Sequence, residues 1–189
     1  MEASMGGVVL ETDRLILRPP EKGDLGFWAE KMADPEAMLH FGGPQPLQGA
    51  WRAMAMISGA WSLDGASLFS VIEKDSGRWL GRVGPWFPPG WPAPEIGWAL
   101  DPRFWGRGYA TEAAARAMDW AFEDLGWTEA VHVIAPANLA SAAVAQRLGS
   151  RLRGMIDSPG LPTPGAPPKP QVQLWGQSRE EWRTRRRGG

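Results

Sequence analysis

The stretch 103–112, read as RFWGRGYATE, most constrains how this chain can fold. Two glycines, Gly106 and Gly108, stand one residue apart between a strand-like run at 95–100 and a strongly periodic helix. Glycine accepts a positive φ and lets a ligand approach the backbone closely. The first turn of a helix adds unpaired N–H groups at the positive end of its dipole. This strand–loop–helix unit therefore predicts an anion site.

Positive charge is available in the same loop. Arg103 and Arg107 flank the glycines, and a guanidinium can bind an oxyanion through two parallel hydrogen bonds. The helix that follows begins near Tyr109, so its free N–H groups lie beside these charges. A short glycine-arginine loop alone is a weak signal, and its position before a helix is what strengthens the prediction.

The order of the remaining elements predicts a mixed α/β domain. Period-two alternation and turn residues predict strands, and 3.6-residue periodicity with caps predicts helices. Asp24 and Asn138 are expected to cap two of the helices, because both side chains can accept from free N–H groups. The expected strands are 10–18, 68–73, 79–83, 95–100, 130–135, 152–156 and 172–175, and the expected helices are 24–34, 47–61, 109–125, 139–148 and 178–182.

Composition restricts the class of protein. A chain of 189 residues with 43% hydrophobic and 22% charged residues predicts one ordinary globular domain. The net charge of −1 argues against a nucleic-acid binder, and the lack of cysteine excludes thiolate chemistry. His40 and His132 have no partner at metal-ligand spacing, so no metal is expected. Without a membrane-length apolar run or a signal-peptide core, a cytoplasmic location is the expectation.

The expected organisation is a loose leader at 1–9, a single domain at 10–182 and a basic tail at 183–189. Proline-rich loops interrupt the domain at 85–94 and at 158–170. These two loops are the segments whose structure the sequence predicts least.

Twelve tryptophans are unusual for this length. One interpretation is genomic codon bias. The other is that some tryptophans line a substrate groove or a subunit contact, as in a homodimer, because aromatic side chains anchor interfaces. Trp86 and Trp91, in the proline-rich loop, are the strongest candidates for the second interpretation.

Several motifs in this order resemble the GNAT superfamily of acyl-CoA-dependent N-acyltransferases, and within it the branch that acetylates the N-termini of ribosomal proteins. The resemblance covers residues 10–182. The motifs are Thr12–Arg18, 34–43, Arg103-x-x-Gly106-x-Gly108 with the overlapping Trp105–Ala113, Asn138-x-x-Ser141, and Arg147-Leu-Gly149.

The resemblance implies a GNAT fold, with a central mixed, mostly antiparallel split sheet of about seven strands flanked by helices on both faces. It implies acetyl-CoA as the co-substrate and no metal. The main chain of Trp98 to Leu100 would align the pantetheine and polarise the thioester carbonyl, and Asn138 would contact the pantetheine. The residues implied for the pyrophosphate are Arg103, Gly106, Arg107, Gly108, Ala110 and Thr111.

The resemblance also implies catalytic roles. Glu95 could accept the amine's proton through a water, although it could equally be an edge glutamate of the strand. Ser141 could donate a hydrogen bond to the departing thiolate, or it could only serve the helix terminus. The sequence departs from the family at Ala145, where many members have the tyrosine that protonates the thiolate, and at Ser150, where phenylalanine is usual.

The expected function is therefore transfer of an acetyl group from acetyl-CoA to a primary amine by direct attack in a ternary complex. An α-amine has a pKa near 8 and a lysine near 10, which favours a protein or peptide N-terminus as acceptor. A small-molecule amine, of the aminoglycoside or polyamine type, is the alternative acceptor. A non-catalytic acyl-CoA-binding or sensing module is the alternative of another class, favoured by Ala145 and Ser150 and opposed by Glu95 and Ser141.

Overall fold

The computed structural model describes residues 7–159 and 169–188 of the chain. Most of the expected leader and the centre of the loop at 158–170 lie outside the described residues. Within them, none of the helices combines the length and the apolar character needed to cross a bilayer. The elements are β1 (Leu10–Glu11), β2 (Leu15–Arg18), η1 (Lys22–Asp24), α1 (Leu25–Ala33), α2 (Leu47–Asp64), β3 (Phe69–Glu73), β4 (Trp79–Trp86), β5 (Glu95–Leu100), η2 (Pro102–Phe104), α3 (Tyr109–Glu123), β6 (Glu129–Ile134), α4 (Leu139–Leu148), β7 (Arg151–Asp157), β8 (Gln171–Ser178) and α5 (Arg179–Arg187).

The described strands form one open, mostly antiparallel sheet in the order β1-β2-β3-β4-β5-β6-β8-β7. This confirms the mixed α/β class. The sheet has eight strands where about seven were expected, because the single strand expected at 10–18 is two short ones. The chain turns at Thr12, whose N–H donates to the carbonyl of Leu15 over 3.0 Å, and β1 then folds back to pair with β2.

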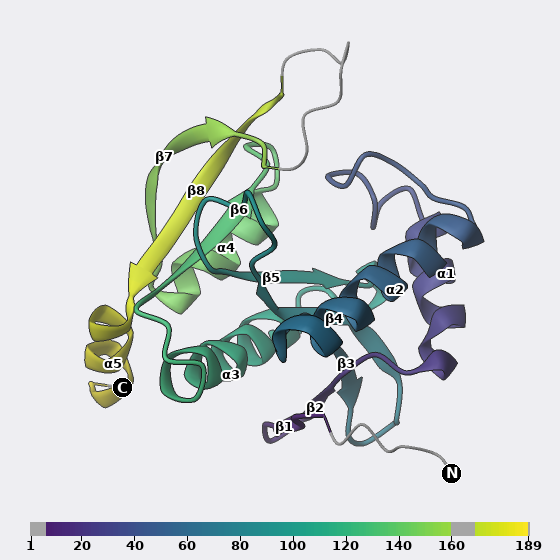
Figure 1. The fold of residues 1–189 in the computed structure, drawn as a ribbon, viewed down its shortest axis with the longest axis horizontal. Coiled ribbons are helices and arrows are strands. Elements are labelled where there is room, and N and C mark those ends of the chain that lie inside the picture. The colour runs from purple at the N-terminus through teal and green to yellow at the C-terminus, as the bar shows by residue number, and fades with distance from the viewer. Residues whose placement is uncertain (1–6, 160–168, 189) are drawn as a thin grey trace.

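The sheet is split between β5 and β6. These two strands are the parallel pair in it, and they are in register only at Glu95 and Val131, next to a hydrogen bond from Val131 N–H to the carbonyl of Pro94. Beyond that point they separate. In Figure 1 the strands β6, β8 and β7 diverge from β5, β4 and β3. The backbone of β5 is consequently without a strand partner on this side from Ile96 onwards.

The core combines large aromatic side chains with small ones along the buried face of α3. Trp61, Phe69 and Trp120 form a cluster with ring centroids 4.9 to 6.0 Å apart. Ala113 and Ala117 are fully buried where α3 packs on β4 and β5, which confirms the close-packing alanine face expected for this helix. Half of the twelve tryptophans are buried and so contribute to the core: they are Trp28, Trp61, Trp79, Trp120, Trp175 and Trp182.

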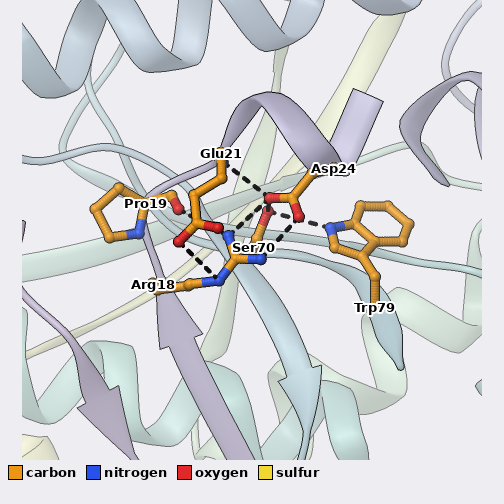
Figure 2. A network of polar contacts seen from close by, with 6 residues as sticks. All are labelled: Arg18, Pro19, Glu21, Asp24, Ser70 and Trp79. Atoms are coloured by element: carbon orange, nitrogen blue, oxygen red, sulfur yellow. Dashed lines mark hydrogen bonds and ion pairs between the residues drawn. The ribbon is translucent and has the colours of Figure 1, made fainter. Parts of the chain in front are cut away.

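A buried carboxylate fastens α1 to the sheet. Asp24 accepts two hydrogen bonds of 2.8 Å from Arg18 and one of 2.7 Å from Ser70, which in turn accepts from Trp79 (Figure 2). The expected cap on α1 is wrong, because the Asp24 side chain makes no cap bond to that helix. The guanidinium of Arg18 occupies the carboxylate instead, and charge-assisted hydrogen bonds of this kind are stronger than a neutral cap.

The C-terminal helix lies against α3. Ser178 opens α5 with a capping box, as expected, and the helix runs on to Arg187. Trp182 donates from its indole nitrogen to Asp119, and Arg183 pairs with Glu123 at 2.8 Å. The basic end of the described chain is therefore attached to α3 by its charges.

Candidate active site

A cavity of about 1120 Å³ lies where β5 and β6 separate. Its walls come from α2, β4, β5, β6, the start of α4 and the loop after β4. Four of the site residues that the family resemblance implied line it: Glu95, Trp98, Asn138 and Ser141. The tertiary structure thus brings together residues that are up to 46 positions apart in the chain.

The alternation of β5 divides the cavity into two sides. Successive side chains of a strand point to opposite faces, and directly paired residues on neighbouring strands share a face. Glu95, Gly97 and Ala99 therefore share the face of their partners on β4, whereas Trp98 belongs to the other face. The pairs are Glu95 with Trp86, Gly97 with Gly84, and Ala99 with Arg82.

Glu95 is a buried carboxyl with two hydrogen bonds. One of its oxygens accepts from the indole N–H of Trp91 at 2.6 Å, and the other accepts from the backbone N–H of Val133 at 3.0 Å. Burial raises the pKa of Glu95 to about 7, although both hydrogen bonds act to lower it. At neutral pH this group can both hold and release a proton, which is the property of a general base.

Trp91 and Trp86 form the wall beside this carboxyl. Their rings meet edge to face with centroids 6.3 Å apart, and both line the cavity. The structure therefore supports the interpretation that these two tryptophans border a groove. It also assigns a contact that the sequence did not predict, because Trp91 reaches Glu95 only through the bend of the loop between β4 and β5.

Ser141 and Asn138 stand on the opposite side of the cavity. The indole N–H of Trp98 donates to the hydroxyl oxygen of Ser141 at 3.2 Å, which leaves the Ser141 proton available for another acceptor. Asn138 caps α4, as expected, by accepting from the backbone N–H of Ser141 at 3.1 Å. The amide NH₂ of Asn138 is not used by that cap.

The edge of β5 offers main-chain groups to the gap. Ile96 accepts there from the ring of His132, and Leu100 accepts from the indole N–H of Trp105 at 3.0 Å. Because backbone groups alternate along a strand, the N–H and C=O of Trp98 point the same way. An extended ligand could pair with this edge as an added strand would.

The glycine loop has the geometry expected of an anion site. Gly106 and Gly108 have φ values of +73° and +81°, which favour glycine. A Cβ at Gly106 would meet nothing within 4 Å, so the loop faces open space. Gly108 is the N-cap of α3 and has no side chain to cap the helix, which leaves the N–H groups of its first turn, Tyr109 to Thr111, for a ligand.

The two loop arginines differ in their surroundings. Arg103 pairs with Asp101 at 2.6 Å and with Glu30 at 3.1 Å, so its charge is already balanced. Arg107 makes no ion pair with a described residue and lies 6.0 Å from the ring of Phe104. Both arginines line a second, smaller hollow of about 350 Å³, to which Arg78 also belongs. Arg78 precedes β4 and carried no motif in the sequence.

His132 of β6 bonds to the backbone of β5 where the two strands separate. Its Nδ1 lies 2.7 Å from the carbonyl of Ile96 and must donate to it, so Nε2 accepts from Ser150 at 2.9 Å. Ser150 accepts in turn from Gln177. Burial lowers the pKa of His132 to about 4, which keeps the ring neutral. Ser150, the departure from the family pattern, thus completes a hydrogen-bond chain that sets where β5 leaves β6.

A family model described as an acetyltransferase (GNAT) domain matches residues 14–151, which is most of the chain. The chain belongs to the GNAT acetyltransferase family. It is accordingly an N-acyltransferase, and the resemblance seen in its motifs is confirmed.

Solved structures agree with this assignment. An acetyltransferase from Agrobacterium tumefaciens is 31% identical, with a TM-score of 0.77 over 95% of this chain and 99% of that one. The ribosomal-protein-S5-alanine acetyltransferase of Vibrio fischeri is 18% identical, with a TM-score of 0.64 over 93% and 98% of the two chains. Mycobacterium smegmatis RimJ in complex with CoA-disulfide is 18% identical, with a TM-score of 0.70 over 88% and 83%. At 18% identity, the last two similarities show only that the chains share a fold.

Two features of this GNAT domain bear on its chemistry. Ala145, at the position of the usual tyrosine, is fully buried against Ile134 and Trp175, so no hydroxyl enters the cavity from there. Among the described residues, histidines and carboxylates form no group of three that could hold a metal ion.

Proposed function

We propose that this protein transfers an acetyl group from acetyl-CoA to a primary amine by direct attack within a ternary complex. The observation that carries the proposal is the single cavity in which Glu95 lies on one wall and Trp98, Asn138 and Ser141 on the other. A base, a hydroxyl and an open strand edge then surround one reaction centre.

The residues present fit the donor. The pyrophosphate would bind at Gly106 and Gly108, against the N–H groups of Ala110 and Thr111. Arg107 is the better placed of the two arginines to add charge, because Arg103 is held by two carboxylates. The pantetheine would follow the edge of β5 past Trp98, with the Asn138 amide as a further donor.

The chemistry then needs little from the protein. The amine nitrogen attacks the thioester carbon, the carbon–sulfur bond breaks, and the acetyl group leaves on nitrogen. Glu95 takes the proton that the amine loses, through a water, and its pKa of about 7 suits that transfer at neutral pH. A main-chain N–H of β5 near Trp98 to Leu100 would stabilise the oxyanion, an effect worth about 3 kcal/mol.

The thiolate of CoA leaves with little assistance from the protein. Its pKa resembles that of a cysteine, about 8.5, so a strong general acid is not required. With Ala145 in place of a tyrosine, Ser141 is the residue that can donate a hydrogen bond to the sulfur. Its oxygen already accepts from Trp98, which orients the remaining proton.

For the acceptor, we propose a free α-amine or a similarly weak amine. Deprotonating an α-amine at pH 7 costs about 3 kcal/mol less than deprotonating a lysine, because their pKa values differ by more than two units. A base with a pKa of about 7 gives moderate assistance only, which favours the weaker amine.

The test is release of CoA from acetyl-CoA across a panel of amines, with thermal unfolding measured in the presence and absence of CoA. We expect stabilisation by CoA, and turnover that falls by a factor of about 10² to 10⁴ in Glu95→Gln. Stabilisation by CoA without turnover of any amine would leave a CoA-binding protein and refute the proposed reaction.

A further inference from the structure

Arg82 is a cation that lines the same cavity without a counter-ion. It lies on β4, is half-buried, and has no carboxylate of a described residue within ion-pair distance. Its guanidinium instead stacks on aromatic rings, 4.9 Å from the ring of Trp28 and 6.0 Å from that of Phe41. A partly desolvated charge is normally paired. Other ionisable residues line the cavity, namely His40, Asp64 and Glu95, but Arg82 is its one permanent cation among the described residues.

The neighbouring charges increase the local positive potential. Lys31 of α1 is 4% exposed, and its ammonium lies 5.6 Å from the centre of the Phe41 ring. Burial first, and then the nearby charge of Arg82, lower the pKa of Lys31 to about 8. Asp101 and Asp34 act to raise the pKa of Lys31 and offset part of its charge, although each also has a partner of its own: Asp101 binds Arg103, and Asp34 accepts from the N–H of Ala37. The Asp24 network in Figure 2 holds the start of α1, and so the position of Lys31.

The sheet places Arg82 on the same face as Glu95, which is the side where the amine acceptor would bind. Arg82 pairs with Ala99, and Ala99 shares its face of β5 with Glu95, four residues away. Between them lies Gly97, where an added Cβ would have only ordinary contacts, the nearest at 3.8 Å to Glu95 and Leu68. The face of β5 between Glu95 and Ala99, the partner of Arg82, therefore carries no large side chain, and it extends over about 13 Å of strand.

We propose that Arg82 binds a carboxylate of the acceptor, so that the substrate is an amine with a carboxylate at its far end. This inference rests on the proposed function, because it takes the cavity beside Glu95 as the acceptor site. A guanidinium binds a carboxylate through two parallel hydrogen bonds, and the aromatic rings of Trp28 and Phe41 hold its plane. The separation of several bonds excludes a simple α-amino acid and suits an ω-amino acid or an N-terminal peptide with an acidic residue.

The experiment measures binding, so that it does not depend on turnover. Isothermal titration in saturating CoA would compare two matched pairs of acetylated products. The first pair is 6-acetamidohexanoate and its amide. The second is an acetylated Ala-Ala-Glu peptide amide and the corresponding Ala-Ala-Gln peptide. The arm that shows a preference for the acid identifies whether the carboxylate belongs to a small molecule or to a peptide.

We expect wild-type protein to bind an acid about tenfold to a hundredfold more tightly than its amide. Arg82→Gln should bind both equally, with unchanged affinity for CoA. Arg82→Lys, which keeps the charge without the planar fork, should retain part of the preference, and it covers the case in which Arg82→Gln folds poorly.

Equal binding of acid and amide by the wild type in both pairs would overturn the inference. So would a preference that survives in Arg82→Gln, or a loss of CoA affinity in that variant, which would assign Arg82 to the donor. An acid preference combined with failure to turn over every free amine would refute only the proposed reaction and leave the carboxylate site standing.

Discussion

Trp91 tunes the proposed base, and replacing it with phenylalanine should shift the pH dependence of catalysis. The variant keeps an aromatic ring in the loop and removes the indole N–H that lies 2.6 Å from Glu95. This hydrogen bond lowers the pKa of Glu95, whereas burial raises it to about 7. Without the bond, the pKa of Glu95 should rise further.

The size of the shift follows from the strength of the bond. A hydrogen bond to a charged group contributes about 1.5 to 3 kcal/mol, and one pKa unit corresponds to 1.36 kcal/mol. Trp91 is partly exposed, so water will replace part of the loss, and a rise of about one unit is expected. With a base of pKa about 8 instead of about 7, kcat/KM should fall about eightfold at pH 6.5 and hardly change at pH 9.

The assay is kcat/KM against pH for both proteins with one amine. The acceptor's own ionisation is identical in the two profiles, so the ratio of wild type to variant isolates the enzyme group. Trp86→Phe is the matched control, because Trp86 lies beside Trp91 but makes no hydrogen bond to Glu95. A ratio that stays constant from pH 6 to pH 9 in a folded Trp91→Phe protein would refute the role of Glu95 as the base.

Three further outcomes are expected. Gly108→Ala should raise the KM for acetyl-CoA several-fold and cost about 1 kcal/mol of stability, because Gly108 has a φ of +81°, while Gly26→Ala, in the exposed part of α1, should leave KM unchanged in the same assay. Ser141→Ala should lower kcat about tenfold with little change in the thermal midpoint, since the cap uses the backbone N–H of Ser141 rather than its side chain; an unchanged kcat would remove Ser141 from catalysis. The pKa of His132 is lowered to about 4 from 6.5, so the unfolded chain binds the extra proton between these values, and stability should fall by up to about 3 kcal/mol as pH drops from 6.5 to 4. Urea unfolding at pH 4.5 and 7 should show this loss in the wild type and a smaller one in His132→Gln.

Much of the fold could be predicted because it depends on local signals. The alanine face of α3, the Asn138 cap and the Ser178 capping box each involve residues within a few positions of one another. The expected cap at Asp24 failed because Arg18 and Ser70, which lie on two strands of the sheet, donate to its carboxylate instead. The division of the first strand into β1 and β2 also depends on a contact, the pairing of Leu10 with Leu17, that alternation alone does not show.

The site was predictable to different degrees. The glycine loop could be predicted because glycines and helix N-termini act on neighbouring residues, and the resemblance to the GNAT family implied roles for Glu95, Asn138 and Ser141. Arg78 and Arg82 carried no motif. Arg82 is relevant because it lines the cavity without a counter-ion among the described residues. Arg78 is relevant because it lines the same hollow as Arg103.

The sequence by itself therefore determined the family, the glycine loop before α3 and the order of the elements, because these depend on residue types at short spacing. Only the tertiary structure decided what surrounds the reaction centre. The pKa of Glu95 depends on burial and on a donor from the loop before it, and Arg82 lies beside the rings of Trp28 and Phe41 rather than beside a carboxylate. Electrostatic energies are set by distance and solvent exposure, and neither quantity is local in the chain.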